Sequence, residues 1–227
     1  MANSVLVIAD SGTGKSTSIR TLDPKETFII NIANKPLPFR GWKGKYTQIT
    51  KDHPKGNLTS AATAPGIIKA MKHVNDKMGH IKTIVVDDWQ YMSSFEYFDR
   101  AHEKGYEKFT QIAANLAAVA KMPKDLRDNL TVIFLTHSED STDLNGNRKV
   151  KAKTIGKMID NTLTLEGLFS IVLFGKVNKN DDGELEYGFE TQNNGENTCK
   201  SPMGMFEDKF IPNDLQFVIS CIEEYNK

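Results

Sequence analysis

The stretch Val5-Leu6-Val7-Ile8-Ala9-Asp10-Ser11-Gly12-Thr13-Gly14-Lys15-Ser16-Thr17 decides the expected fold. An apolar run that fits a buried strand is followed at once by a glycine-rich turn and by Lys-Ser at the start of a helix. This order is typical of a phosphate-binding loop. Glycines let successive backbone N–H groups curl around an anion, and the helix adds the positive end of its dipole. The segment therefore predicts a site for nucleotide phosphates.

The residue types in this loop have separate parts in the predicted site. Lys15 is expected to reach the β- and γ-phosphates, and the Ser16 hydroxyl to ligate Mg²⁺. Ala9 stands where the usual pattern begins with glycine, a departure that removes no phosphate-contacting group. The alternative is a Gly/Ser-rich turn with a chance lysine. The residues expected to contact nucleotide are Ser11, Gly12, Thr13, Gly14, Lys15, Ser16 and Thr17.

The composition fits an ordinary globular protein. The 227 residues suit one large α/β domain, taken here as residues 1–227, although two small domains are possible. Lys+Arg and Asp+Glu both count 29, so a polyanionic partner would need a local positive patch. No apolar run reaches membrane-spanning length, which predicts no membrane partner. Cys199 and Cys221 lack metal-site spacing and favour a reducing cytoplasm.

Beyond the loop, strand-like apolar runs alternate with helical patterns. Asn180-Asp181-Asp182-Gly183 predicts a hairpin turn between the last two strands. Continuous apolar strands separated by helices predict an α/β fold, with a mostly parallel central sheet covered by helices on both faces and a C-terminal β-hairpin extension. We expect strands at about 4–9, 27–32, 83–88, 131–136, 170–177 and 185–191, and helices at about 15–22, 61–78, 106–128 and 212–225.

Two aspartates end the apolar run Ile84-Val85-Val86. A carboxylate at the carboxyl end of such a strand is where a phosphate-loop protein holds its magnesium. Asp87 is therefore expected to bind Mg²⁺ opposite Ser16, and Asp88 to orient or deprotonate the attacking water. The alternative is that both aspartates only cap the helix that begins near Trp89.

The strand at 131–136 ends in Thr136-His137-Ser138. In a sheet of this kind its tip lies near the γ-phosphate, so Thr136 or His137 is a candidate to hydrogen-bond the attacking water or a phosphate oxygen. A lone histidine after a strand is equally well explained as a solvated loop residue.

Arg148-Lys149-Val150-Lys151-Ala152-Lys153, with Lys157 close behind, gathers five cations without an acid between them. Alternation would put Lys149, Lys151 and Lys153 on one side of an extended ribbon after the turn Asn145-Gly146-Asn147. Arg148, Lys149, Lys151 and Lys153 are thus candidates to track a nucleic-acid backbone. A solvated surface hairpin explains the same pattern.

A lysine also follows the late strands, in Thr198-Cys199-Lys200-Ser201-Pro202. Lys200 is a candidate to reach the γ-phosphate of a neighbouring subunit as a finger in trans. An exposed turn lysine is the alternative.

The chain resembles phage-encoded AAA-type ATP-binding proteins, which have a RecA-like phosphate-loop core. The resemblance covers most of the sequence. It rests on the loop at 11–17, the Phe28-Ile29-Ile30-Asn31 run with Lys35-Pro36-Leu37-Pro38-Phe39, the segment Val85 to Met92, and the segment Cys199 to Phe206. Some members of this group bind single-stranded DNA and promote strand annealing in phage recombination. The first and third motifs are specific for ATP binding, and none is specific for recombination.

Carried over by position, the resemblance implies ATP contact along 12–17, magnesium at Ser16 and Asp87, and a DNA-contacting loop at 148–153. It also strengthens Lys200 as a finger, and implies a homo-oligomeric ring or filament in the cytoplasm of an infected bacterial host. Ile32-Ala33-Asn34 stands where RecA-like ATPases often carry a glutamate that activates water. This departure leaves Asp88 as the substitute base and predicts slow or DNA-dependent turnover.

The sequence thus predicts a Mg-ATP-dependent ATPase that binds single-stranded DNA and acts with phage recombination or replication proteins. Water would attack the γ-phosphate in line, with Lys15, Mg²⁺ and a neighbour's Lys200 stabilising the developing charge. Two alternatives come from other classes. One is a nucleotide-switched module that recruits a protein and scarcely turns over. The other is a small-molecule kinase, although no arginine-rich lid segment follows the core.

Overall fold

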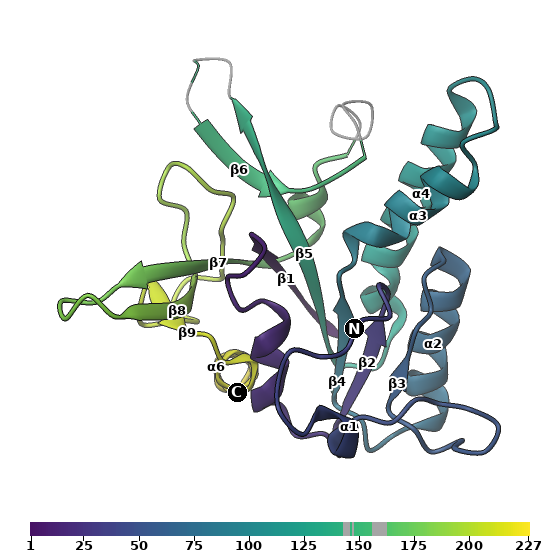
Figure 1. Ribbon diagram of the computed structural model, residues 1–227. Helices are drawn as coiled ribbons and strands as arrows, with labels where there is room; N and C mark the ends of the chain where they lie inside the picture. The colour runs from purple at the N-terminus through teal and green to yellow at the C-terminus, as the bar shows by residue number, and fades with distance from the viewer. Residues whose placement is uncertain (143–145, 147, 156–162) are drawn as a thin grey trace.

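The computed structural model describes residues 1–142, 146, 148–155 and 163–227 (Figure 1). The strands are β1 Asn3–Ala9, β2 Thr27–Asn31, β3 Leu58–Thr59, β4 Thr83–Asp87, β5 Thr131–Thr142, β6 Arg148–Ala152, β7 Ile171–Lys179, β8 Leu185–Glu190 and β9 Phe210–Pro212. The α-helices are α1 Trp42–Lys45, α2 Ala64–Lys77, α3 Gln90–Asp99, α4 Glu107–Lys121 and α6 Leu215–Tyr225. Short 3-10 turns are η1 Ser16–Thr21, η2 Met122–Asp125 and η3 Leu165–Leu168. Asn145, Asn147 and Lys157 lie outside the described residues.

The sheet has the strand order β3-β2-β4-β5-β1-β7-β8-β9, and β6 pairs with the outer part of β5. Neighbouring strands from β3 to β7 are parallel, whereas β8 pairs antiparallel with both β7 and β9. Gly183, with φ of 80°, sits in the turn that joins β7 to β8. The expected mostly parallel sheet with a C-terminal hairpin is confirmed, and it is consistent with the fold of phosphate-loop NTPases.

Helices cover both faces of this sheet, as expected for strands that are apolar on both sides. Ile67 of α2, Leu116 of α4 and Trp89 before α3 pack in one buried cluster with alternate residues of the strands. Ile19 of η1 and Val218 of α6 pack in a second cluster with the intervening strand residues. The carboxyl ends of β1 and β4 and the middle of β5, where His137 lies opposite Ala9, are thereby held at one edge of a layered core. The polar residues discussed below lie at that edge.

The helix expected at 15–22 is present at Ser16–Thr21, but it is a 3-10 helix, η1, and not an α-helix. The hydroxyl of Ser18 donates to the carbonyl of Lys15 at 2.5 Å, and that of Thr21 donates to the carbonyl of Ser18 at 2.9 Å. Such side-chain bonds three residues back compete with the regular α-helical pattern. Asp23 and Pro24 then follow, so the helix has no room to lengthen.

Two other boundaries differ from the expected ones. The helix expected at 106–128 ends at Lys121 and continues only as η2, because Pro123 lacks the N–H that another α-helical turn needs. The strand expected at 131–136 continues to Thr142, because residues 138–142 pair antiparallel with β6. This extension and β6 form a two-stranded arm, residues 138–142 and 148–152, that projects beyond the sheet edge (Figure 1).

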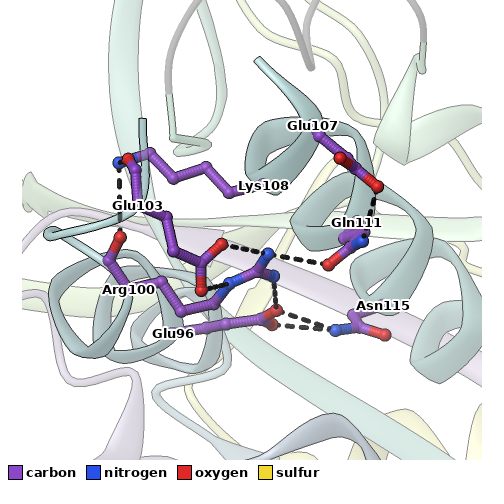
Figure 2. A network of polar contacts seen from close by, with 7 residues as sticks. All are labelled: Glu96, Arg100, Glu103, Glu107, Lys108, Gln111 and Asn115. Atoms are coloured by element: carbon purple, nitrogen blue, oxygen red, sulfur yellow. Dashed lines mark hydrogen bonds and ion pairs between the residues drawn. The ribbon is translucent and has the colours of Figure 1, made fainter. Parts of the chain in front are cut away.

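A polar network fixes the outer ends of α3 and α4 against each other (Figure 2). The guanidinium of Arg100 donates to Glu96 at 3.0 Å, to Glu103 at 2.7 Å and to Gln111 at 2.7 Å. The Lys108 ammonium donates to the carbonyl of Glu103 at 2.9 Å. Planar guanidinium geometry allows one residue to bind these partners together, which ties the connection between the two helices to both of them.

Within the described ranges, no helix combines the length and apolar character needed to cross a membrane.

Candidate nucleotide site

The phosphate loop leaves the carboxyl end of β1 and enters η1. Gly12 and Gly14 both have φ of 85°, a left-handed conformation that glycine adopts without a steric penalty. The side chain of Thr13 donates to the carbonyl of Asp10 at 2.8 Å and closes the turn between them. The two glycines that the sequence pattern requires therefore stand where the backbone conformation requires them.

Ala9 is accommodated by a glycine on the neighbouring strand. In the parallel register of β1 and β7, Ala9 lies opposite Gly175, and a Cβ built on Gly175 would be 2.7 Å from the Cβ of Ala9. Real Cβ atoms do not approach so closely, so only one of the two positions can carry a methyl group. Gly175 thus leaves room for the methyl group of Ala9, which replaces the usual first glycine of the loop.

The loop meets the two aspartates at the carboxyl end of β4. The Ser16 hydroxyl donates to Oδ1 of Asp87 at 2.8 Å, and the Lys15 ammonium lies 3.0 Å from Oδ1 of Asp88. Lys15, Asp87 and Asp88 are all buried, with exposed fractions of 6%, 3% and 1%. Residues from two distant sequence motifs therefore form one compact charged cluster.

Asp87 and Ser16 fit a magnesium ion. Burial raises the pKa of the Asp87 carboxyl, and the nearby Lys15 charge and the Ser16 hydrogen bond offset only part of that effect. A buried carboxylate beside a hydroxyl is a donor set that Mg²⁺ accepts, because this ion usually takes few protein oxygens and completes its shell with water and phosphate. Among the described residues, no cluster of three or more His, Cys, Asp or Glu side chains offers a fuller protein cage.

Asp88 is the centre of the charged cluster. Its second oxygen, Oδ2, lies 2.5 Å from the ammonium of Lys35, and Nε2 of His137 lies 3.5 Å from its Oδ1. Burial alone would raise the pKa of Asp88, but the His137 hydrogen bond and the Lys15 and Lys35 charges outweigh it and hold the pKa below its usual range. Asp88 has φ of 58°, a strained conformation for a residue with a side chain.

A cavity of about 510 Å³ joins these groups to the C-terminal part of the chain. Lys35 and His137, which both contact Asp88, line it together with Asp88 and the phosphate loop. Its lining residues are Asp10, Ser11, Gly12, Gly14, Lys15, Ser16, Thr17, Arg20, Lys35, Pro38, Asp88, Tyr91, His137, Tyr187 and Asn213. A volume of this size, lined by the phosphate loop and the charged cluster, suits a nucleotide.

Thr136 and His137 occupy different environments, although they are neighbours in the middle of β5, where its pairing with β1 ends. His137 lines the cavity, as expected of a residue that contacts a phosphate or water. The Thr136 side chain is 1% exposed and its hydroxyl donates to Oε1 of Gln90 at 3.3 Å. The Thr136 hydroxyl is therefore directed at the start of α3, whereas His137 faces the cavity, and the part of either residue in catalysis stays a prediction.

The predicted cationic ribbon forms β6, but acids of the facing strand accompany it. Arg148 lies 2.9 Å from Asp140, and Lys151 lies 3.1 Å from Glu139. The ammonium of Lys149 donates to the carbonyl of Gly195. The predicted contact of Arg148, Lys149, Lys151 and Lys153 with DNA stays a prediction.

Lys200 lies away from this cavity. Its backbone exchanges two hydrogen bonds with Val172, of 3.0 and 2.8 Å, near the beginning of β7. Val172 stands opposite Leu6 in the register, whereas the loop begins beyond Ala9 at the other end of β1. The exposed Lys200 is therefore placed for solvent or for another molecule, and its action in trans stays a prediction.

Sequence reasoning did not identify several residues that complete the cavity. Asn213 donates to the carbonyl of Gly14 at 3.2 Å and accepts from Arg20 at 2.9 Å, while Tyr187 lines the cavity beside it. Arg20 and Asn213 are 193 positions apart, so no local spacing signals their contact. Lys35 belongs to one of the segments that carry the family resemblance, but sequence reasoning gave it no role. The missing glutamate at residues 32–34, just before it, was the signal that could have drawn attention to this loop.

The chain matches the sequence model of a protein family described as an AAA domain, over residues 1–203. A comparison with curated proteins finds no match.

Proposed function

The chain belongs to the AAA domain family, and we propose that it binds ATP with Mg²⁺ and hydrolyses the terminal phosphate. The observation that carries this proposal is the meeting of Lys15 and Ser16 with Asp88 and Asp87 across the sheet edge. Loop amides, an ammonium, a hydroxyl and two carboxylates are the groups that phosphoryl transfer to water requires.

The chain's own residues suggest how the reaction proceeds. The N–H groups of the loop orient the phosphates, and Lys15 leaves Asp88 to neutralise charge on the terminal ones. Magnesium, held by Ser16 and Asp87, would supply further positive charge to the phosphate oxygens. As Lys15 moves away, the proton affinity of Asp88 rises, so that its carboxylate can orient a water molecule and accept its proton.

Calorimetry and a phosphate-release assay test this proposal. Wild-type protein should take up ATP in the presence of Mg²⁺ and release inorganic phosphate. Lys15→Ala should abolish uptake, while thermal unfolding stays close to wild type because Asp88 keeps its contacts with Lys35 and His137. Absence of ATP uptake by the wild type would refute the proposal. Phosphate transfer to a metabolite would favour a kinase, and uptake without turnover would favour a nucleotide-switched module.

We also propose that single-stranded DNA binds the arm, in a recombination or replication role. The supporting observation is that Ser138, where the arm leaves the sheet, donates a hydrogen bond to Asp10 of the phosphate loop. The arm and the loop are therefore in direct contact, so a nucleotide that moves Asp10 can act on the arm.

Changing Lys149, Lys151 and Lys153 together to Ala tests the DNA proposal. The variant should bind single-stranded DNA less tightly, and its salt dependence should fall by about 0.7 in logarithmic slope for each lost phosphate contact. A control variant changes three exposed lysines of α2, Lys69, Lys72 and Lys77, to Ala. Equal DNA affinity and equal salt dependence in the two variants would exclude the arm as the DNA-binding site.

A further inference from the structure

The side chain of Asn31 holds the backbone of Lys35 in place. The side chain of Asn31, at the end of β2, donates to the carbonyl of Lys35 at 2.6 Å and accepts from its N–H at 3.3 Å. Asn34, just before Lys35, adopts φ of 52° and accepts a hydrogen bond from Ser60 at 2.8 Å. A strained residue and a two-way clamp together keep this loop at the sheet edge.

The clamp aims the side chain of Lys35 at the second aspartate. Asn31 stands opposite Asp87 in the parallel register of β2 and β4, so the loop after Asn31 passes beside Asp88. The Lys35 ammonium lies 2.5 Å from Oδ2 of Asp88 and 5.7 Å from the centre of the Tyr91 ring. Its side chain is nevertheless 58% exposed, so it can leave Asp88 without disturbing the core.

The two oxygens of Asp88 indicate which phosphate Lys35 can reach. Lys15 contacts Oδ1 of Asp88 and Lys35 contacts Oδ2, so one carboxylate holds both ammonium groups, and both lysines line the same cavity. In a phosphate loop the amides hold the inner phosphates and the lysine reaches the outer ones. A cation that shares a carboxylate with Lys15 is therefore expected near the terminal phosphate of a triphosphate, which a diphosphate lacks.

Resting on the proposed function, we infer that Lys35 binds the terminal phosphate and sets the preference of this site for nucleoside triphosphate over diphosphate. In the empty site Lys35 neutralises Asp88. With triphosphate bound, the ammonium turns from the carboxylate to the phosphate, which also frees Oδ2 of Asp88.

The test compares two affinities in one protein. Calorimetry with Mg²⁺ measures the binding of a non-hydrolysable ATP analogue and of ADP to the wild type, Lys35→Met and Lys35→Arg. Lys35→Met should weaken the analogue about tenfold or more and ADP by less than about twofold. Lys35→Arg should keep most of the preference because it keeps the charge.

Lys43→Met is the matched control, since Lys43 lies over the Trp42 ring at 5.9 Å and lines a different pocket. It should leave both affinities unchanged. The double variant Lys35→Met/Asp88→Asn removes the carboxylate that Lys35 neutralises, and it should still bind the analogue weakly.

Three results would overturn the assignment of Lys35: an unchanged analogue affinity in Lys35→Met, an equal loss for both nucleotides, or full recovery in the double variant. The last result would mean that Lys35 only shields Asp88. Failure of the wild type to bind either nucleotide would instead refute the proposed function itself.

Discussion

The Ser16 hydroxyl donates a 2.8 Å hydrogen bond to Oδ1 of Asp87, although 71 positions separate the two residues. Beside this pair, Lys15 contacts Asp88, so two consecutive loop residues meet two consecutive aspartates. The pKa values of the two carboxyl groups are nevertheless shifted in opposite directions. Burial raises the pKa of Asp87, whereas hydrogen bonds and cations prevail over burial at Asp88 and lower its pKa. This contrast gives the two aspartates opposite effects on stability.

Asp87→Asn should raise the melting temperature of the nucleotide-free protein at pH 7. Because the folded-state pKa of Asp87 is raised, its contribution to stability is present below the unfolded value of about 3.9 and is lost as pH rises through the folded pKa. The gain should therefore shrink as the pH is lowered toward about 4. Thermal unfolding between pH 4 and 8 measures this, and a variant less stable than wild type at pH 7 would contradict it. Magnesium-dependent ATP uptake should weaken in the same variant.

Asp88→Asn should have the opposite effect on stability. A lowered folded-state pKa contributes stability that is present above the unfolded value and is lost as pH falls through the folded pKa, so the variant should melt lower than wild type at pH 7. The difference in melting temperature between the variant and wild type should become smaller at acidic pH. Asn is the suitable replacement because it tolerates the φ of 58° found here. ATP should still bind, while phosphate release should fall sharply. Normal turnover would exclude Asp88 as the base.

The phosphate loop and the alternation of strands with helices were predictable because they depend on local signals. Glycines, an apolar run and a following Lys-Ser are consecutive in sequence, and apolar strands on both faces imply covering helices. The kind of helix at η1 was not predictable in this way. There the hydroxyls of Ser18 and Thr21 bind carbonyls three residues back, and this competition outweighs the pattern of apolar residues.

The remaining cavity residues come from contacts that have no local signature. Asn213 reaches Gly14 from the turn between β9 and α6, and the Lys35 loop reaches Asp88 because β2 lies beside β4. Likewise, the acids that accompany β6 belong to the outer part of β5, so the cationic run looked isolated in sequence. Such contacts follow from the pairing of strands, which is known only once the sheet is assembled.

Lys200→Ala should impair a neighbouring subunit's site rather than its own. The residue is exposed and lies beside Val172, near the start of β7, so a finger action requires a second copy. Mixing Lys200→Ala with Lys15→Ala subunits should give phosphate release that departs from the sum of the separate proteins. Lys209→Ala, at another exposed lysine, is the control. Strictly additive activity, with a single-subunit mass in solution, would reject action in trans.

Gly175→Ala should destabilise the protein, and Ala9→Gly in the same chain should reverse most of the loss. The built Cβ of Gly175 lies 2.7 Å from that of Ala9 and 3.5 Å from the Thr13 hydroxyl. The extra methyl group must therefore push apart β1 and β7 at the start of the phosphate loop, and overpacking of this kind costs about 1–3 kcal/mol. ATP affinity should fall with stability, because the displaced residues begin the loop.

Denaturant unfolding of the wild type, the two single variants and the double variant forms a double-mutant cycle. Ala9→Gly alone removes a buried methyl group without adding a clash, so it should cost less than Gly175→Ala. The double variant should then recover both stability and ATP affinity, since one methyl group again occupies the space between the strands. Additive losses in the double variant would show that the two positions do not share this space, and that Ala9 departs from the usual glycine for another reason.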